Sequence, residues 1–310
     1  MAMMDSFFSM NTLKNPFLLT DEPAYQAWRQ NKLDNYPDSL QQLVVAIDAS
    51  MPTLEHCAAI SAVCKKTNIA IYRLDNPAAS SKAFVHALGE QLGLMRLDGN
   101  LCADSDSVTS LQVMDTGRQS GYIPYSNRPL SWHTDGYYNL PEQRIRAMLL
   151  HCVRDAQSGG DNMLLDHEMA YIQLRDQNPA FIRALMQDDA MTIPPNIEGD
   201  EMIREARTGP VFSVDPQTGQ LHMRYSARAR NVIWRDDAIT RAAVSTLTAL
   251  LTDKNPYVIK YRLQPGEGII CNNVLHGRSG FEDDPAPGKN RLLFRARYFD
   301  RIKNSSSTMN

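Results

Sequence analysis

His133-Thr134-Asp135-Gly136 places an imidazole and a carboxylate two residues apart in this chain of 310 residues. On an extended segment, side chains at positions i and i+2 point to the same side, so His133 and Asp135 can face one cavity. Gly136 lets the backbone bend away directly after them. The same residues would also suit a surface turn, because Thr-Asp-Gly is a common turn sequence. The motif alone therefore leaves both interpretations open.

A second histidine lies far downstream, in Leu275-His276-Gly277-Arg278. Two imidazoles and one carboxylate on three corners of a metal leave the opposite face open, which suits a non-haem ferrous centre that binds a cosubstrate and oxygen. A lone histidine at the end of a strand is more often an ordinary polar side chain. If the fold brings His276 to His133 and Asp135, however, the three side chains can share one metal ion.

The last predicted strand carries several arginines on one face. Alternation along residues 291–299 places Arg291, Arg295 and Arg297 on the same side. Burying arginines without anions is costly, so these side chains either face solvent or meet carboxylates. The second explanation suits a site for a dicarboxylate cosubstrate, because an arginine can hold a carboxylate through a forked pair of hydrogen bonds.

The composition is ordinary for a globular protein, with 43% hydrophobic residues, 22% charged residues and a net charge of -3. This balance provides no global basic field for nucleic acid or for an anionic membrane. No apolar run is as long as a membrane span, and residues 1–15 lack the basic start of a secretory signal. Five cysteines without a Cys-x-x-Cys pair indicate free thiols, so we expect a cytoplasmic protein.

Hydrophobic periodicity predicts a helix-rich first part, followed by strands with inserted helices. The predicted helices cover residues 24–35, 39–48, 53–66, 80–94, 166–177, 178–187 and 237–252. The predicted strands cover residues 69–74, 111–115, 145–153, 257–263, 268–272 and 291–299, with a hairpin formed by 210–214 and 220–225.

We predict a mostly β fold with α-helices, in which a double-stranded β-helix (jelly roll) core carries N-terminal and inserted helices. A jelly roll brings distant strands side by side, as a metal shared by His133 and His276 requires. The length suits a single catalytic domain over residues 1–303, with a helix-rich N-terminal part at 1–110 and a jelly-roll core with helical insertions at 111–300. Residues 304–310 are predicted to form a disordered tail.

Several motifs occur in the order found in one known family. They are Trp132-His133-Thr134-Asp135-Gly136-Tyr137-Tyr138, Leu149-Leu150-His151-Cys152, Gly159-Gly160-Asp161-Asn162, Met223-Arg224-Tyr225-Ser226, Leu275-His276-Gly277-Arg278 and Arg291-Leu292-Leu293-Phe294-Arg295. Together they resemble the taurine dioxygenase and gamma-butyrobetaine hydroxylase (TauD/TfdA-like) superfamily of iron- and 2-oxoglutarate-dependent oxygenases. The resemblance implies an oxidoreductase that uses Fe(II), 2-oxoglutarate and molecular oxygen to hydroxylate an unactivated carbon of a small polar metabolite, with release of succinate and carbon dioxide.

The resemblance also implies roles for individual residues. His133, Asp135 and His276 would bind the iron and form the catalytic centre. Arg291 would hold the distal carboxylate of 2-oxoglutarate, with help from Asn162, which stands where the family often has threonine. Halogenating relatives replace the carboxylate ligand with a small residue, so Asp135 implies hydroxylation or the related desaturation.

The residues that contact the substrate are less sharply defined. Arg295 matches a position that contacts the substrate sulfonate in taurine dioxygenase, so it is either an anion hook or a brace for Arg291 at the cosubstrate. Trp132, Tyr137 and Tyr138 flank the metal motif. They form either an aromatic cage for a cation, as in the butyrobetaine relatives, or ordinary packing.

Two classes of function remain. The first is an oxygenase that acts on a small molecule, and the second is a non-catalytic metal-binding jelly-roll protein that serves as a sensor or scaffold. Retention of all three ligand residues and of Arg291 favours the enzyme. A protein-bound substrate is the alternative within the enzyme class, whereas the balanced charge argues against nucleic acid and membrane partners. Family analogy suggests a homo-oligomer, either a dimer or a tetramer.

Overall fold

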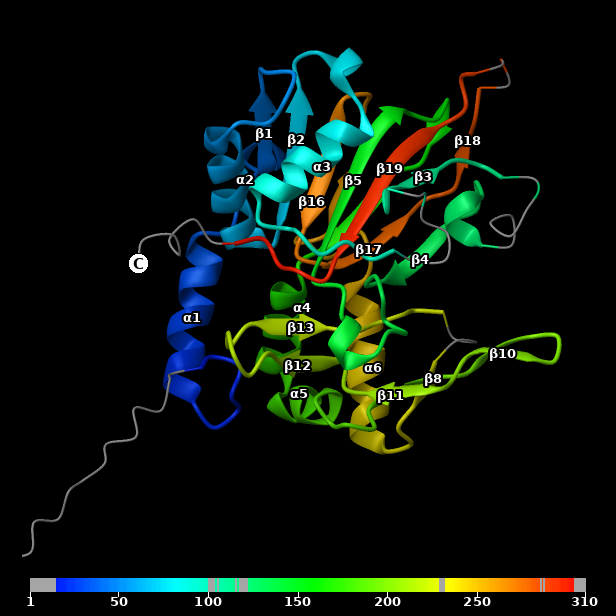
Figure 1. Cartoon of the computed structure of the whole chain (residues 1–310). Coiled ribbons are helices and arrows are strands. Elements are labelled where there is room, and N and C mark those ends of the chain that lie inside the picture. Colours follow the sequence, from blue (N-terminus) through cyan, green and yellow to red (C-terminus); the bar gives the residue numbers. More distant parts are fainter. Residues whose placement is uncertain are drawn as a thin grey trace, which may run out of the picture.

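The computed structural model describes residues 15–99, 104, 106–114, 116, 122–228, 232–284, 286 and 288–303. The tail predicted at 304–310 lies outside these residues. Long strands, with helices on one face, occupy one half of the molecule, whereas further helices and short strands occupy the other half (Figure 1). The strand-rich half positions the candidate site.

The larger sheet combines strands from both ends of the chain. Within the described residues its six strands run in the order β1 (Val44–Ile47), β2 (Ile69–Leu74), β16 (Glu267–Cys271), β5 (Ala147–Arg154), β19 (Leu292–Tyr298) and β3 (Thr109–Leu111). β1 and β2 are parallel, and the other neighbours are antiparallel. The helix-rich first part of the chain thus supplies two strands of this sheet.

The smaller sheet packs against the larger one. Its four described strands run in the order β15 (Ile259–Tyr261), β7 (Asn162–Leu165), β17 (Leu275–Arg278) and β4 (Leu130–His133). Leu164 of this sheet shares one buried cluster with Ile71, Leu150 and Ile269 of the larger sheet. Two sheets around one apolar core, with strands distant in sequence as neighbours, confirm the predicted jelly roll.

Two helices, α2 (Leu54–Thr67) and α3 (Lys82–Gln91), cover the outer face of the larger sheet (Figure 1). Phe84 of α3 and Tyr298 of β19 belong to the buried cluster beneath these helices. Leu293, on the other face of β19, packs inside the jelly roll. Since side chains alternate along a strand, the inner face of β19 is also the face of its arginines.

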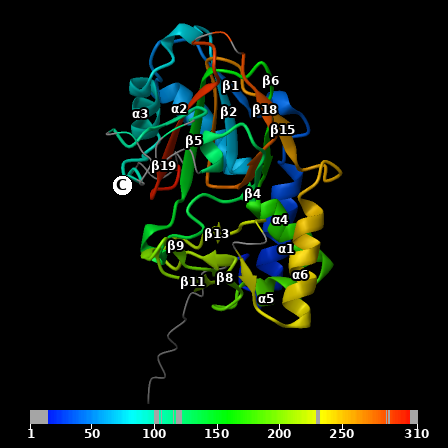
Figure 2. The same ribbon diagram turned by 90° about the vertical axis from the view of Figure 1, so that its right-hand side faces the viewer.

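The other half of the molecule is a helical lobe (Figure 2). Its helices are α1 (Glu22–Asp34), α4 (His167–Gln177), α5 (Pro179–Leu185) and α6 (Ala238–Leu250). Its short strands are β8 (Met191–Ile193), β9 (Asn196–Glu198), β10 (Glu201–Arg204), β11 (Arg207–Gly209), β12 (Phe212–Val214), β13 (Leu221–Met223) and β14 (Ile233–Trp234). Tyr171, Phe212 and Leu247 belong to the buried cluster that joins the helices to these strands.

The remaining described elements are short. They are β6 (Ser158–Gly159), β18 (Phe281–Glu282) and the 3-10 turns η1 (Leu40–Leu43), η2 (Pro77–Ala79), η4 (Ile123–Tyr125) and η5 (Pro141–Gln143). β6 and β18 pair antiparallel, which ties the loop after β17 to the loop after β5.

Polar residues start the helices. Asp166, Asn178 and Asp237 accept hydrogen bonds from backbone N–H groups in the first turns of α4, α5 and α6. With ends shifted by a few residues, the structure confirms the helices predicted at 24–35, 53–66, 80–94, 166–177, 178–187 and 237–252.

The helix predicted at 39–48 is wrong. Leu40–Leu43 form a 3-10 turn, and Val44–Ile47 form β1. Two valines and one isoleucine give β1 a β-branched composition, and parallel pairing with β2 holds it in the sheet. Tertiary pairing therefore overrides the helical spacing that the apolar residues suggested.

The predicted strands agree better with the structure. Residues 69–74 form β2 as predicted, and the predicted hairpin is β12 paired with β13. The prediction for 111–115 is displaced, because β3 is Thr109–Leu111 and residues 112–114 lie outside any strand. Only Leu111, which packs inside the jelly roll, belongs to both ranges.

Among the described residues, no helix combines the length and the apolar character needed to cross a membrane. The described cysteines Cys57, Cys64, Cys152 and Cys271 are free and buried.

Candidate metal centre and cavity

The register of the smaller sheet brings the two predicted histidines together. β17 pairs antiparallel with β4, and His276 is the direct partner of His133. The centroids of the two rings are 4.2 Å apart. One ligand atom from each of His133, Asp135 and His276 lies within 4.8 Å of the other two. Three potential ligands from distant segments therefore converge on one point.

The turn after β4 is held in place from both sides. Thr134 donates its backbone N–H to the Tyr225 carbonyl at 3.0 Å and accepts from the Tyr225 N–H at its hydroxyl oxygen at 3.1 Å. Gly136 has a φ of 65°, and a Cβ atom there would lie 2.6 Å from a side-chain carbon of Ile145. Glycine is therefore required for the bend that presents Asp135 to the histidines.

Asn273 fixes the backbone of Asp135. Its side-chain oxygen accepts from the Asp135 N–H at 2.8 Å, and its amide donates to the carbonyls of Asp135 at 2.9 Å and Ile145 at 2.7 Å. Asn273 is 2% exposed, so these hydrogen bonds are shielded from water. Asn273 belongs to the Cys271-Asn272-Asn273 stretch, where the family has an Asp-Asn pair, but its contact with Asp135 was not predicted.

Both imidazoles direct the same nitrogen to the shared point. Nδ1 of His133 lies 2.9 Å from the Ser131 carbonyl, and Nδ1 of His276 lies 2.9 Å from the Val274 carbonyl. A carbonyl can only accept, so each Nδ1 carries the proton and each Nε2 keeps its lone pair. Metal-ligating histidines are oriented in this way by a hydrogen bond at the other nitrogen.

The ionisation of the cluster suits a divalent cation. Burial, together with the neighbouring His276, lowers the pKa of His133 from 6.5 to about 3, so its imidazole is neutral at physiological pH. Burial opposes ionisation of Asp135, but the charges of Arg295 and Arg297 outweigh it and lower the pKa of its carboxyl. Neutral imidazoles and an ionised carboxylate are the forms that bind metals.

The surroundings of the two carboxylate oxygens of Asp135 indicate whether a metal ion fits this site. Oδ2 is buried and accepts no hydrogen bond from the described residues. Oδ1 lies 3.9 Å from Nε2 of His133 and 3.7 Å from the nearest nitrogen of Arg297. A buried carboxylate oxygen without a partner is costly, and a cation bound between Asp135 and the two histidines would satisfy it. The residues therefore fit the ferrous ion that the sequence analysis predicted.

Arg295 and Arg297 line the wall beside this cluster, as alternation along the strand predicted. Arg297 is 5% exposed, pairs with Asp98 and donates to the Tyr138 hydroxyl at 3.3 Å. The nearest nitrogen of Arg295 lies 4.0 Å from Asp135, and its buried Nε has no partner among the described residues. Arg297 is thus neutralised by its neighbours to a greater degree than Arg295.

Arg291, directly before β19, and Asn162, the first residue of β7, line a smaller cavity together. Arg291 is 5% exposed, and its guanidinium carbon lies 4.9 Å from the centroid of the Phe281 ring. Among the described residues, no carboxylate forms an ion pair with it, and burial lowers its pKa to about 10. Asn162 donates to the Tyr261 carbonyl at 3.2 Å. A buried guanidinium without a carboxylate partner is a natural anion site.

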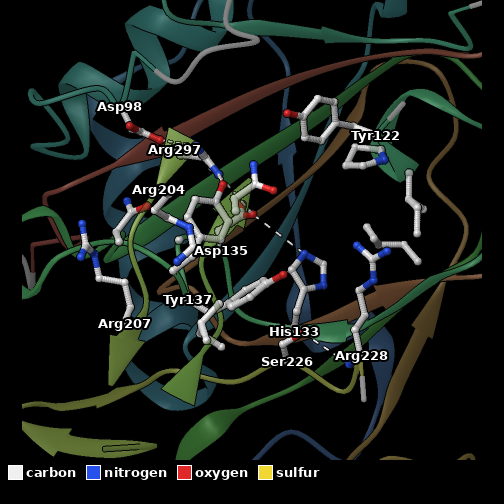
Figure 3. Close-up of a pocket in the computed structure, with 18 of the residues that line it drawn as sticks. Asp98, Tyr122, His133, Asp135, Tyr137, Arg204, Arg207, Ser226, Arg228 and Arg297 are labelled. Atoms are coloured by element: carbon white, nitrogen blue, oxygen red, sulfur yellow. Dashed lines mark hydrogen bonds and ion pairs between the residues drawn. The ribbon is translucent and has the colours of Figure 1, made fainter. Parts of the chain in front are cut away.

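A cavity of about 690 Å³ opens beside the three potential ligands (Figure 3). His133, Asp135, Tyr137 and Tyr138 line it together with the arginines Arg128, Arg204, Arg207, Arg228, Arg295 and Arg297. The carboxylates among its described lining residues are Asp98 and Asp135. The cavity therefore carries a strong excess of positive charge.

The predicted aromatic trio is divided by the structure. Tyr137 and Tyr138 line the cavity, with ring centroids 5.1 Å apart. Although it packs against the cluster of the helical lobe as both tyrosines do, Trp132 is not among the described lining residues. The reason is strand alternation, which turns Trp132 away when its neighbour His133 faces inward. The guanidinium of Arg204 lies 5.8 Å from the Tyr138 ring, so a cation of the chain already approaches this ring.

Other lining residues had no signal in the sequence. Asp98 precedes a stretch without a recognisable motif, and Arg204 and Arg207 lie on a hairpin whose position depends on the helical lobe. Charge alone could not separate these residues from ordinary surface side chains.

Comparison with known proteins places the chain in a family. A uridine-5'-phosphate dioxygenase from Amycolatopsis sp is 34% identical over 182 residues, which cover 56% of this chain and 62% of that enzyme. An enzyme of the same name from Streptomyces sp is 30% identical over 213 residues, covering 66% of this chain and 74% of the other. The match to the Amycolatopsis enzyme thus spans less than two thirds of its length.

Solved structures share the fold at low sequence identity. The structure of asparagine oxygenase with Fe(II), 3-hydroxyasparagine and succinate matches with a TM-score of 0.58 at 14% identity, covering 83% of this chain and 93% of that one. The family model of the taurine catabolism dioxygenase TauD, TfdA family matches residues 71–297. This chain therefore belongs to the TauD, TfdA family of dioxygenases, which confirms the predicted family and, with the solved structures, the predicted jelly-roll fold.

Proposed function

We propose that this chain is an iron(II)- and 2-oxoglutarate-dependent dioxygenase that hydroxylates an unactivated carbon of a small metabolite bearing a phosphate group. A nucleoside 5'-monophosphate is the first candidate, and succinate and carbon dioxide are the other products. The observation that carries the proposal is the convergence of His133, Asp135 and His276 beside a cavity lined by arginines.

The three converging side chains would hold the iron. Both histidines present Nε2, and Asp135 contributes the oxygen that has no partner among the described residues. The bound iron supplies the oxidative chemistry that amino-acid side chains lack. Hydrogen bonds from Asn273 hold the backbone of Asp135, so the carboxylate meets the metal in a fixed position.

Arg291 and Asn162 would bind the distal carboxylate of 2-oxoglutarate. The Arg291 guanidinium is buried, stacks near Phe281 and has no carboxylate partner among the described residues. Arg291 directly precedes β19, and Arg295 follows four residues later on the inner face of that strand, roughly 13 Å along an extended chain, so a cosubstrate held at Arg291 would extend toward the metal. Arg295 then lies between cosubstrate and substrate.

The charge of the cavity supports an anionic substrate. Arginines outnumber carboxylates among its described lining residues, and one of the two carboxylates is the potential metal ligand. A trimethylammonium substrate would meet repulsion there, so the aromatic-cage alternative loses support. Two relatives that are at least 30% identical carry the name uridine-5'-phosphate dioxygenase, which supports a nucleotide in particular. Arg295, with its unpartnered Nε, is our candidate for contact with the bound substrate.

We favour a small-molecule substrate over a protein-bound one, because two of the candidate ligands, His133 and Asp135, line a cavity of limited size. We also propose a single catalytic domain over residues 1–303 and a cytoplasmic location, the latter supported by the free described cysteines. A homo-oligomer remains our expectation from the family. A non-catalytic sensor or scaffold is the competing function, and turnover decides between them.

The direct test is succinate release from 2-oxoglutarate by the purified chain with Fe(II) and ascorbate. Uridine 5'-phosphate should stimulate release, and His276→Ala should abolish it. A panel of other small phosphorylated and unphosphorylated metabolites runs in parallel. Stimulation by an unphosphorylated compound alone would overturn the proposed substrate class but retain the oxygenase. Failure to bind Fe(II) would overturn the oxygenase itself.

A further inference from the structure

We propose that Arg204 and Arg207 form the subsite that binds the phosphate of the substrate and thereby select phosphorylated substrates. This inference rests on the proposed function. It adds a location and two residues that neither the family motifs nor the metal centre specify.

The subsite belongs to a projecting part of the helical lobe. Arg204 ends β10, and Arg207 begins β11, so two intervening residues separate the two arginines. Both line the cavity, and Figure 3 shows them on the same side of it. β11 is anchored by antiparallel pairing with β8, which gives Arg207 a fixed base.

The contacts within the chain do not neutralise this pair. Arg204 donates to the carbonyls of Glu205 and Pro194, each at 2.7 Å. Arg207 lies 3.4 Å from a carboxylate oxygen of Glu205, but that side chain is 79% exposed. The Nε of Arg207 is buried and has no partner among the described residues. Neutral carbonyls and one solvated carboxylate orient the guanidiniums but leave their charges uncompensated.

The two charges also repel each other. Burial and the neighbouring Arg207 both lower the pKa of Arg204. Holding two partly buried guanidiniums near one another is unfavourable unless an anion joins them. A phosphate dianion offers several acceptor oxygens, and paired guanidiniums match that geometry through forked hydrogen bonds.

The position of the pair suits the metal centre. The Arg204 guanidinium lies 5.8 Å from the Tyr138 ring, and the Tyr138 hydroxyl accepts from Arg297 at 3.3 Å. Arg297 in turn lies 3.7 Å from the potential metal ligand Asp135. Tyr138 and Arg297 therefore connect the subsite to the candidate metal centre along the wall of one cavity, whose volume of about 690 Å³ leaves space for the rest of a small substrate.

Arg228 is the competing candidate within the same cavity. Figure 3 shows it on the other side of the cavity, near His133. Its backbone N–H donates to the Ser226 hydroxyl at 3.4 Å. A single guanidinium offers one forked pair of hydrogen bonds, whereas Arg204 and Arg207 together offer two. Arg228 therefore fits a phosphate dianion less well.

The experiment compares a phosphorylated ligand with its unphosphorylated counterpart. Dissociation constants for uridine 5'-phosphate and uridine are measured by anaerobic calorimetry on the full chain with Fe(II) and 2-oxoglutarate. The variants are Arg204→Gln, Arg207→Gln and Arg228→Gln, and Arg183→Gln on the exposed face of α5 is the matched control. The affinity for 2-oxoglutarate is measured in each variant as a check on folding and on the metal centre.

In the wild type, we expect uridine 5'-phosphate to bind at least tenfold more tightly than uridine, since charge-assisted hydrogen bonds contribute about tenfold or more. Arg204→Gln and Arg207→Gln should each remove most of that gain in affinity. Uridine and 2-oxoglutarate should bind as before, and Arg183→Gln should match the wild type. The proposed subsite would be overturned if Arg204→Gln and Arg207→Gln both kept the gain in affinity from the phosphate group. It would also be overturned if Arg228→Gln lost that gain instead.

The two proposals fail in different ways. If uridine 5'-phosphate does not bind, ribose 5-phosphate and ribose become the test pair. A phosphate gain there that depends on Arg204 and Arg207 would retain the subsite and reject the nucleotide. If no phosphorylated compound binds more tightly than its unphosphorylated counterpart, the subsite is rejected, whereas succinate release with another substrate would still support the oxygenase.

Discussion

The side-chain amide of Asn273 holds the backbone of Asp135 through two hydrogen bonds. The amide oxygen accepts from the Asp135 N–H at 2.8 Å, and the amide nitrogen donates to the Asp135 carbonyl at 2.9 Å. The same amide donates to the Ile145 carbonyl at 2.7 Å. A potential metal ligand is thus locked in position by a residue that does not itself reach the metal. Such outer contacts preserve ligand geometry.

Replacing Asn273 with aspartate should therefore disturb both stability and metal binding. The new carboxylate would face the carbonyls of Asp135 and Ile145, so a donor would be lost and acceptors would oppose each other. We expect the free energy of unfolding to fall by about 2 kcal/mol, the usual cost of an unsatisfied buried polar group. Urea denaturation and Fe(II) titration measure the two effects. Asn31→Asp, on an exposed position of α1, is the control, and an equal effect there would contradict this role.

Replacing Asp135 with alanine should weaken Fe(II) binding by more than the roughly 10- to 100-fold expected when an outer contact is lost. Asp135 is 5% exposed and is the one carboxylate among the three candidate ligands found in the described residues. Anaerobic metal titration measures the loss, with Asp188→Ala at an exposed position as the control. Hydroxylation at the normal rate by Asp135→Ala would contradict the ligand assignment.

Replacing Arg291 with glutamine should act on the cosubstrate and spare the metal. Its guanidinium is buried at the smaller cavity, where a carboxylate would gain a charge-assisted pair of hydrogen bonds. We expect the KM for 2-oxoglutarate to rise about 10- to 100-fold, with Fe(II) affinity retained. Steady-state kinetics at varied 2-oxoglutarate, with Arg183→Gln as the control, provide the measurement. If the variant instead loses affinity for Fe(II) and keeps its affinity for 2-oxoglutarate, Arg291 does not bind the cosubstrate.

Arg295→Gln separates the two explanations left open for Arg295. If Arg295 contacts the substrate, the KM for the substrate should rise about tenfold or more while the KM for 2-oxoglutarate stays unchanged. Its place in the lining of the large cavity, beside Asp135, supports this outcome. If only 2-oxoglutarate binding changes, Arg295 is a brace for the cosubstrate and the substrate contact is rejected.

The convergence of the three candidate metal ligands was predictable because a ferrous centre would need few and distinctive residues. His133 ends β4 and Asp135 follows two residues later in the turn, where both still reach one point, and the alternation of a strand placed Arg295 and Arg297 together on β19. Both inferences use local geometry that does not depend on the rest of the fold. The direct pairing of His276 with His133 then follows from jelly-roll topology.

Other features depend on contacts that local sequence does not encode. The amide of Asn273 meets Asp135 only after β17 has docked beside β4. Arg204 and Arg207 reach the cavity because a hairpin of the helical lobe extends beside the jelly roll. Val44–Ile47 is a short apolar run that suits helix or strand, and its pairing with β2 decides the outcome. The sequence motif likewise could not show that Tyr137 and Tyr138 line the cavity whereas Trp132 is not among its described lining residues.

His151 predicts a pH dependence of stability that is independent of the metal. It is fully buried in β5, and Nδ1 lies 2.9 Å from the Tyr72 hydroxyl. Burial lowers its pKa from 6.5 to about 4. Between these pH values the unfolded chain binds a proton that the folded chain does not, so the free energy of unfolding must fall as the pH falls from 6.5 to about 4.

His151→Gln should remove this contribution, which amounts to about 3 kcal/mol across that pH range. Urea denaturation of the metal-free chain at a series of pH values measures it as the difference between wild type and variant. Tyr72→Phe is the matched control, because it removes the partner hydroxyl but keeps the imidazole. The control should retain the pH dependence of the wild type even if it is less stable overall. Parallel stability curves for wild type and His151→Gln between pH 4 and 6.5 would show that this imidazole titrates alike in both states, contrary to the effect of its burial.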